Sequence, residues 1–244
     1  MKSIMSNGEK KEDKGFFSGK FLGNIKSGFR RRKFARLKND ILWNAYSIPK
    51  MDRTINRLVN MGEEAIPIFA EALESDDFVV RKGGAKGLGK LCCPSTIPIL
   101  CNALKDEDNF VAKNAAEALG NIGKALLEEA KDGKMLEPKD YANLNKMAIP
   151  ALVDCLKDRS NYLMASARAE AAKSLGKIGN ALLQIERGPE RSMGYLNFCK
   201  IAIPALENAS KRRLVGETSR NANEALVAIR RGPNCSSNSE IGGA

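Results

Sequence analysis

The sequence predicts an all-α protein in which four two-helix repeats stack side by side into a solenoid. An Ile-Pro motif returns four times, at Ile66-Pro67, Ile97-Pro98, Ile149-Pro150 and Ile203-Pro204. Each copy leads into an Ala- and Gly-rich segment that ends in a leucine, and the proline and that leucine lie 21, 21, 25 and 22 residues apart. Such self-similarity is typical of repeat architectures, in which each unit buries its apolar face only against its neighbours.

A basic segment comes first along the chain. Residues 1–50 hold 13 basic and 4 acidic side chains, so most of the net charge of +11 belongs to this short segment. We expect residues 1–14 to be a disordered charged leader and residues 15–38 to be a basic amphipathic arm. The apolar arm residues recur every four positions, and no acidic residue interrupts the basic ones: Phe17, Phe21, Ile25, Phe29, Arg30, Arg31, Arg32, Lys33, Arg36 and Lys38.

Three roles are open for this arm. A basic amphipathic helix can lie on an anionic membrane surface, or it can bind an acidic partner such as a protein groove or RNA. It can also pack onto the first repeat as a structural cap. Glycines at positions 15, 19, 23 and 28 weaken the arm as an isolated helix, so we expect it to fold on contact.

Residues 39–231 are predicted to form the solenoid. A cap over residues 39–62 comes first, with helices expected at Asn39–Tyr46 and Asp52–Met61 and a stop at Gly62. The repeats then start near residues 65, 96, 148 and 202. Residues 232–244 are polar and rich in Ser, Gly and Asn, so they are predicted to be a flexible tail.

Each repeat is predicted to open with a first helix, helix A, that begins at the Ile-Pro motif. Proline is favoured there because the first helical N–H has no partner within the helix in any case, and because the ring already fixes a helical φ angle. In the third copy, Ile149, Leu152, Val153 and Leu156 recur at the spacing that places them on one helical face. That face must be buried against another element.

A polar turn and a second helix, helix B, complete each repeat. Asp and Ser residues in turns such as Ser75-Asp76-Asp77 and Lys105-Asp106-Glu107-Asp108 can accept hydrogen bonds from the free N–H groups that open helix B. Helix B is rich in small residues, for example in Ala115–Gly123 and Ala171–Gly179. Small residues let helices approach closely, which favours a stacked solenoid.

The combined pattern resembles the HEAT repeat, in the short form found in phycobilin lyase subunits. It consists of Ile-Pro-x-Leu, an acidic turn, Val-Arg and Ala-Ala-x-Ala-Leu-Gly-x-Ile-Gly, and it covers residues 65–231. The resemblance implies a right-handed α-solenoid of HEAT-like hairpins, an alpha-alpha superhelix. The arginine that opens helix B in the family is present as Arg81 and Arg168, whereas Ala112 and Ser219 replace it elsewhere. The fourth copy also lacks the acidic turn, as expected of a terminal repeat that caps the array.

Two insertions of similar sequence lengthen the chain after the second and third helix B. Each begins with a leucine pair, at Leu126-Leu127 and Leu182-Leu183, and ends with an aromatic-containing segment, at Tyr141–Leu144 and Tyr195–Phe198. Equivalent insertions in a solenoid emerge on the same edge, so the two are predicted to stack into an accessory ridge. Their apolar residues either seal this ridge or form an edge that binds a partner.

The composition disfavours an enzyme. Histidine is absent, which removes the commonest general base at neutral pH and most zinc and iron sites. The chain shows no nucleophile paired with a base, no Gly-rich phosphate loop and no metal-ligand spacing. We therefore predict no catalytic residue, no metal and no cofactor. The resemblance to the HEAT-type deoxyhypusine hydroxylase is limited to the repeats. The metal sites of that enzyme use His-Glu pairs, and this chain has no histidine.

The six cysteines are predicted to be free thiols. They show neither a C-x-x-C pair nor regular spacing: Cys92, Cys93, Cys101, Cys155, Cys199 and Cys235. We therefore expect a reducing compartment such as the cytoplasm, where the protein is free or peripheral to a membrane. Cys101 and Cys155 stand where other copies have Ala or Val, so they are predicted to be small core residues. The adjacent pair Cys92-Cys93 is a weak candidate for thiol chemistry.

The favoured function is that of a non-catalytic binding or scaffold module with a protein partner. Solenoids of this class bind along the surface lined by the B helices, and the basic arm would add a second contact. With each repeat leucine as the buried reference, the positions predicted to be exposed and to contact the partner are Lys82, Lys86, Lys90, Lys113, Asn114, Glu117, Asn121, Glu170, Lys173, Lys177, Arg220, Asn221 and Glu224. Glutamates interspersed among the lysines suit a protein ligand better than a run of phosphates.

Two other functions stay open. The resemblance to phycobilin lyase subunits implies a chromophore lyase-like activity or a chaperone role toward pigment proteins, and only then would a bilin be bound. The net positive charge also allows a nucleic-acid binder. Aromatic residues make up only 6% of the chain, however, so binding through rows of stacking rings is disfavoured.

Overall fold

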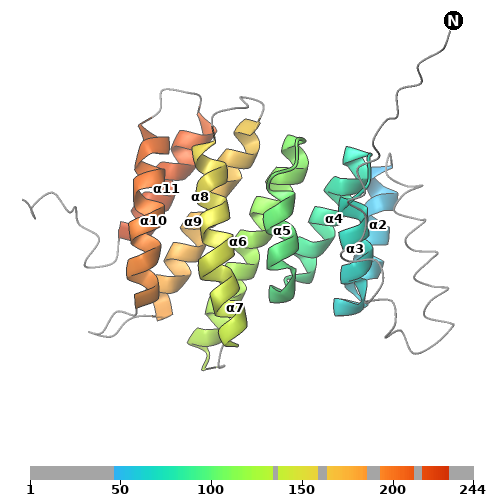
Figure 1. The fold of residues 1–244 in the computed structure, drawn as a ribbon, viewed down its shortest axis with the longest axis horizontal. Coiled ribbons are helices and arrows are strands. Elements are labelled where there is room, and N and C mark those ends of the chain that lie inside the picture. The colour runs from blue at the N-terminus through green and yellow to red at the C-terminus, as the bar shows by residue number, and fades with distance from the viewer. Residues whose placement is uncertain (1–46, 134–136, 159–163, 186–192, 212–215, 231–244) are drawn as a thin grey trace, which may run out of the picture.

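The described part of the chain is a row of helices. The computed structural model describes residues 47–133, 137–158, 164–185, 193–211 and 216–230, and within these ranges it contains helices and turns but no strand. The helices follow one another along the long axis of the molecule (Figure 1). The prediction of an all-α solenoid is therefore confirmed. None of the described helices is both long and apolar enough to span a membrane.

The helices alternate between two roles. A leading helix, α2 (Ile48–Val59), precedes four hairpins. The hairpins are α3 (Ile66–Leu73) with α4 (Phe78–Leu91), α5 (Ile97–Ala103) with α6 (Asn109–Lys131), α8 (Ile149–Lys157) with α9 (Ala165–Ile185), and α10 (Met193–Ser210) with α11 (Glu217–Arg230). Short 3-10 turns at Gly62–Ala65 and Pro94–Thr96 lead into α3 and α5, and α7 (Pro138–Asn143) with a π-helical turn at Leu144–Ala148 leads into α8.

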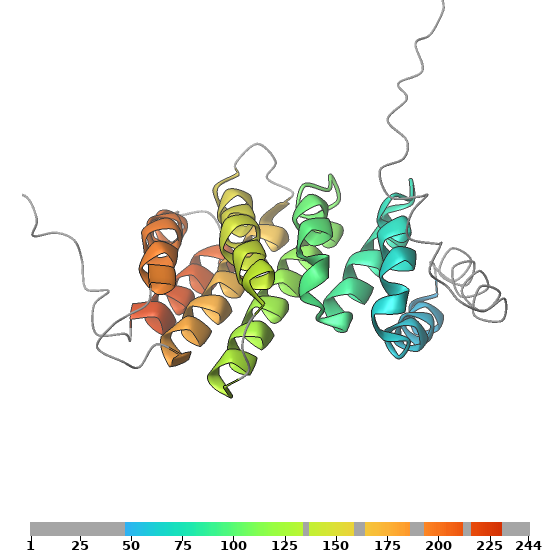
Figure 2. The same ribbon diagram turned by 60° about the horizontal axis from the view of Figure 1, so that its bottom comes forward.

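The two kinds of helix form two layers. Helices α4, α6, α9 and α11 pack against one another in chain order, and each also packs against the A helix of its own hairpin. The A helices α3, α5, α8 and α10 form the second row, which Figure 2 shows above the B helices. Helix α2 packs on α4, at the end of the B layer. Its residues Met51, Ile55 and Leu58 are buried there, so α2 closes the N-terminal side of the described array.

The acidic turns begin the B helices as predicted. The Asp77 carboxylate accepts a hydrogen bond of 2.8 Å from the Val79 N–H and caps α4. The Asp108 carboxylate accepts bonds of 2.9 Å from Phe110 and 3.1 Å from Val111 and caps α6. These carboxylates satisfy N–H groups that have no partner inside the helix.

The Ile-Pro motif starts a helix in three of the four repeats. Helices α3, α5 and α8 begin at Ile66, Ile97 and Ile149, as predicted. The prediction is wrong for the fourth repeat, where Pro204 lies inside α10. There the inserted residues already form a helix before the proline arrives. In the third repeat the π-helical turn directly before Ile149 relieves the same conflict, because a proline ring clashes with the carbonyl group four residues earlier.

The two insertions lengthen existing helices instead of forming a separate ridge. The first continues α6 to Lys131 and adds α7 before α8, and the second continues α9 and extends α10 at its start. The extended ends of α6 and α9 lie side by side, where Lys131 Nζ donates to Gln184 Oε1 at 3.2 Å. The apolar residues of the insertions seal the packing of these helices and not a ridge, since the following described ones are buried: Leu126, Leu127, Leu144, Leu182, Tyr195 and Phe198.

A repeated small-residue contact sets the spacing of the B layer. The glycine that follows each repeat leucine faces the residue that precedes the leucine of the next repeat. An added Cβ on Gly89 would lie 2.8 Å from the Ala118 Cβ, and one on Gly176 would lie 2.9 Å from the Ala225 Cβ. At Gly120 the added Cβ would lie 2.9 Å from the Ser174 Cα. Real Cβ atoms do not approach this closely, so the B helices can lie as near as they do only because these positions carry no side chain.

The last B helix departs from this pattern. In α11 the residue after the repeat leucine is Val227, which is 54% exposed. Three residues later Arg230 stands where the second and third repeats have Gly123 and Gly179, and its guanidinium pairs with Glu207 of α10. Both small positions of the stacking surface are thus filled by larger side chains at the end of the row.

Candidate protein-binding surface

The predicted partner-binding residues all lie on the B helices α4, α6, α9 and α11, and the side of this layer that they are predicted to form is here called the B face. Four of them are exposed, namely Lys90, Lys173, Arg220 and Glu224. Eight are half-buried: Lys82, Lys86, Lys113, Asn114, Glu117, Asn121, Lys177 and Asn221. The neighbouring B helices pack against one another, and most side chains of this set are only partly exposed.

Many of these side chains bridge neighbouring helices. Lys86 pairs with Asp52 of α2 at 2.7 Å, and Lys90 donates to Asn56 of α2 at 2.7 Å. Further along the row, Lys177 of α9 donates to Asn121 of α6 at 2.8 Å, and Asn221 of α11 donates to the Ala169 carbonyl of α9 at 3.0 Å. These residues therefore hold the B layer together, a role that the sequence analysis did not predict.

Glu170 is buried, which corrects the prediction that it is exposed. It lies at the position five residues before the repeat leucine, as do the buried Gly83 and the half-buried Asn221. That position faces the preceding B helix, because the close stacking turns it inward. The Glu170 carboxylate pairs with Lys173 at 3.3 Å. Burial lowers the pKa of the nearby Lys177, and the Glu170 charge opposes this shift.

Two lysines of the B face have no such bond. No carboxylate or amide partner is found for Lys82 of α4 or Lys113 of α6 in the part of the chain that the structure describes. The Lys82 ammonium instead lies 5.8 Å from the centre of the Phe110 ring, across the step from α4 to α6. At this distance a cation is attracted to the face of an aromatic ring.

Two exposed phenylalanines at the start of α4 and α6 were missed by the sequence analysis. Phe78 is 44% exposed and Phe110 is 53% exposed. A signal was available, because Phe78 precedes Lys82 by four residues and so continues the outward series Lys82, Lys86 and Lys90 back by one turn. The prediction stopped the series one turn too early.

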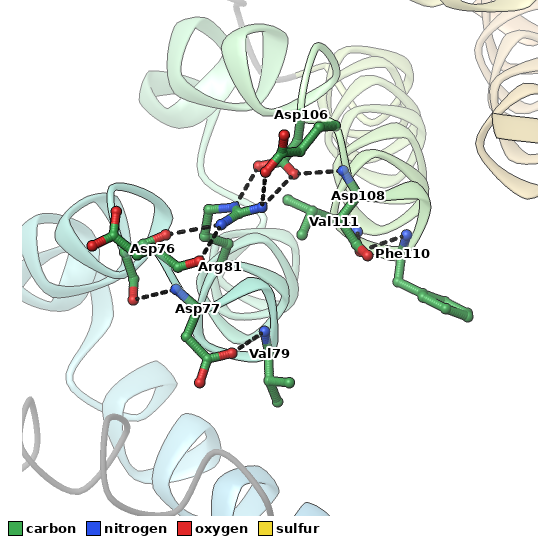
Figure 3. Close-up of polar contacts among 10 residues, drawn as sticks. Asp76, Asp77, Val79, Arg81, Asp106, Asp108, Phe110 and Val111 are labelled. Atoms are coloured by element: carbon green, nitrogen blue, oxygen red, sulfur yellow. Dashed lines mark hydrogen bonds and ion pairs between the residues drawn. The ribbon is translucent and has the colours of Figure 1, made fainter. Parts of the chain in front are cut away.

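Arg81 organises the turns beside this surface. Its guanidinium makes a bidentate pair with Asp106 of the next repeat, with Nε at 2.8 Å and Nη2 at 3.1 Å from the two carboxylate oxygens. Its Nη1 donates to the carbonyls of Ser75 and Asp76, both at 3.0 Å. Figure 3 shows the arginine between the two turns, with the Phe110 ring pointing away from this network. The hydrogen bond with Asp106 raises the pKa of Arg81, so it is always charged.

Four of the described cysteines are shielded rather than activated. Burial raises the pKa of Cys101 and of Cys155 to about 11, in agreement with their predicted role as small core residues. Burial also raises the pKa of Cys92 and of Cys93, where a reactive thiol would need a lowered one. Cys235 lies outside the described residues, as do the basic arm and the helix expected at Asn39–Tyr46.

The comparisons with known proteins agree with this architecture. The HEAT repeats family matches residues 62–133, which contain the first two hairpins, α3–α4 and α5–α6. This part of the chain therefore matches HEAT repeats. Arg81 and the caps Asp77 and Asp108 lie within the matched residues. No curated protein matches its sequence closely enough to be compared with it.

Solved structures share the HEAT-like fold. The complex of CpcE and CpcF of phycocyanin lyase from Nostoc sp. PCC7120 matches with a TM-score of 0.58 and 17% identity, over 80% of this chain and 98% of that chain. An engineered protein matches with a TM-score of 0.47 and 19% identity, over 87% of this chain and 47% of that one. At 17% identity, the likeness to the phycocyanin lyase complex shows the fold alone.

Proposed function

We propose that this HEAT-repeat chain is a non-catalytic scaffold that recognises a protein partner through its B face. The observation that carries the proposal is the packing of α4, α6, α9 and α11 in one layer, which places side chains from four helices on a common side. Bridging residues such as Lys86 and Lys177 fix this layer, so it is organised before a partner arrives. Preorganisation of this kind lowers the entropy cost of binding.

Charge reversal on the B face tests this function. The variant combines Glu117→Lys, Arg220→Glu and Glu224→Lys, all of them half-buried or exposed and none of them bridging two described helices. The control reverses exposed charges of the A layer, with Asp154→Lys, Lys157→Glu and Lys200→Glu. Proteins captured from an extract of the source organism are quantified by mass spectrometry. We expect a partner that wild type and control retain and that the B-face variant loses. Equal capture by all three chains would end the proposal.

We propose further that the basic arm, residues 15–38, is a second contact. Two linked contacts raise affinity through effective concentration, and a basic arm makes binding sensitive to salt. Deleting residues 1–38 is expected to leave a folded solenoid whose partner binding is weaker and less salt-dependent. A deleted chain that has lost its helical circular dichroism would show instead that the arm is a structural cap.

A second candidate is a lyase-like or chaperone role toward pigment proteins. The observation that favours it is that the fold likeness extends over 98% of the matched phycocyanin lyase chain. Under this proposal the chain would bind a linear tetrapyrrole, and mixing the two would change the absorbance spectrum of the bilin. Unchanged spectra would leave the scaffold function. A nucleic-acid role would instead show a steep loss of affinity for RNA between low and moderate salt.

A further inference from the structure

We propose that the step from α4 to α6 on the B face is a docking site for an acidic protein segment that carries apolar side chains. This proposal rests on the proposed function, since the site is part of the B face, and it names the place and the chemistry of the contact. The site consists of Phe78, Lys82, Phe110 and Lys113. We call these four residues the Phe-Lys step.

The apolar half of the site is made by the two rings. Phe78 and Phe110 lie in the first turns of adjacent helices and remain 44% and 53% exposed, whereas most large apolar side chains among the described residues are buried. Rigid aromatic side chains that stand in water at a packed surface are typical anchors of protein interfaces, because burying them gains much area at little entropy cost. The rings therefore fit apolar side chains of a partner.

The charged half of the site is made by the two lysines. Lys82 stands against the Phe110 ring, and Lys113 follows Phe110 by three residues on the same helix. The other lysines of the predicted set are used within the fold, since Lys86, Lys90, Lys173 and Lys177 have carboxylate or amide partners. Neither lysine of the Phe-Lys step forms an ion pair with a described carboxylate, and an acidic partner would supply one.

Three carboxylates of the acidic turns next to the step are already bonded within the fold. Asp77 and Asp108 cap α4 and α6 with hydrogen bonds to backbone N–H groups, and Asp106 is held by Arg81. The same turns argue for a protein segment over RNA. The exposed Glu107, at the edge of the step, would repel a phosphate backbone that must follow the surface continuously, whereas a peptide can place its carboxylates only over the lysines.

Selection from a random dodecapeptide library displayed on phage tests the proposal with the full chain. We expect the selected peptides to be enriched in Asp and Glu together with Leu, Phe or other apolar residues. Their binding should weaken at least tenfold in the Phe78→Ser, Phe110→Ser double variant and in Lys82→Glu, with Lys113→Glu giving a smaller loss. Matched controls on the A layer are Met147→Ser with Ile201→Ser, which removes similarly exposed apolar side chains, and Lys157→Glu. These controls should bind as wild type does, and thermal melts should show that all variants are folded.

Three results would overturn the proposal: a selection that yields no binder, binders that are neutral or basic, or binders that the double variant retains. Tighter binding of a uridine oligonucleotide than of the selected peptides at the same step would assign it to RNA instead. Peptides whose binding is lost only in the Arg220→Glu, Glu224→Lys double variant would refute the Phe-Lys step. They would leave the scaffold function of the B face intact. If the charge-reversal variant and the Phe78→Ser, Phe110→Ser double variant both retain the partner, the scaffold function of the B face and the Phe-Lys step are both refuted.

Discussion

At the scale of single residues, Arg81 links two repeats through one side chain. It is bonded to carbonyl groups of its own repeat and to the Asp106 carboxylate of the next, and both side chains are about nine-tenths buried. Ser219 donates to the Ser210 carbonyl and Arg168 to the Asp158 carbonyl from the equivalent positions. The position of Arg81 thus supplies a donor to the A–B turn in three repeats, and Arg81 also reaches the Asp106 carboxylate in the turn of the next repeat.

Arg81→Ala should destabilise the fold strongly. The change leaves the buried Asp106 without its bidentate partner, and breaking such a pair costs about 2–4 kcal/mol of unfolding free energy. Urea unfolding followed by circular dichroism measures the cost. The matched control is Arg220→Ala, an exposed arginine on α11, for which we expect a change below about 0.5 kcal/mol. Equal effects of the two variants would show that the network contributes nothing.

The thiols of Cys101 and Cys155 should react slowly in the folded chain. With a pKa of about 11, only about one thiol in a thousand is ionised near pH 8, and iodoacetamide attacks the thiolate. The labelling rate of the native protein, measured by mass spectrometry, should rise about tenfold per pH unit. Because the folded pKa lies above the unfolded value of about 9, these thiols stabilise the fold below pH 9, and that contribution is lost as the pH rises toward 11. Rapid labelling at neutral pH would contradict the burial of these thiols.

Single residues were predicted unevenly from sequence, for a physical reason. The caps at Asp77 and Asp108 were predicted because a cap acts within three residues of the chain. Glu170 was placed wrongly and Phe110 was missed, because their exposure depends on how a neighbouring helix packs. The pair between Arg81 and Asp106 spans 25 residues and also depends on how the repeats stack.

At the scale of helices, the glycine contacts decide how closely the B layer packs. The Ser174 hydroxyl donates to the Ala116 carbonyl at 2.8 Å beside Gly120, so the junction between α6 and α9 joins a close contact to a buried hydrogen bond. The small residues and their role in stacking were predictable from composition. The exact partner of each glycine was not, because it is set by the offset between adjacent helices.

Gly120→Ala should destabilise the chain although alanine favours helices. Its Cβ would collide with the Ser174 side chain and lie 2.9 Å from the Ser174 Cα. Such overpacking lowers the free energy of unfolding, measured by urea unfolding, by about 1–3 kcal/mol. Asn180→Ala, an exposed position on α9, is the control and should change stability by less than about 0.5 kcal/mol. A stabilised Gly120→Ala protein would mean that helix propensity outweighs the junction contact.

The start of the first helix of the fourth repeat was predicted wrongly from the sequence. An Ile-Pro motif starts a helix at Ile66 and Ile97, where turns precede it, but not at Pro204, where a helix is already under way. The motif itself is identical in these repeats. The difference comes from the inserted residues, whose buried Tyr195 and Phe198 hold the extended start of α10 against the core.

At the scale of the whole molecule, Val227 ends the row. At the other junctions of the B layer the equivalent residue is Gly89, Gly120 or Gly176, and an added Cβ would meet the next helix there. The predicted role of the fourth copy as a cap thus has a structural basis in side-chain size.

A fused fifth hairpin tests this role of Val227. A copy of residues 93–131 joined after Arg230 would set a second Ala118 against position 227, as Gly89 meets Ala118 in the native chain. With Val227→Gly we expect the added hairpin to resist limited proteolysis and to unfold together with the rest, because neighbouring repeats stabilise one another. With valine in place it should be digested first. Equal protection in both fusions would show that Val227 does not limit stacking.

The position of these junctions also determines where the molecule could change its length. A tandem duplication of residues 134–185 would set Gly176 against a second Ser174, repeating the contact that Gly120 makes in the native chain. We therefore expect extra hairpins to be accommodated between α6 and α11 more readily than beyond Val227. A longer or shorter binding face could thus evolve, or be engineered, with both ends of the protein left unaltered.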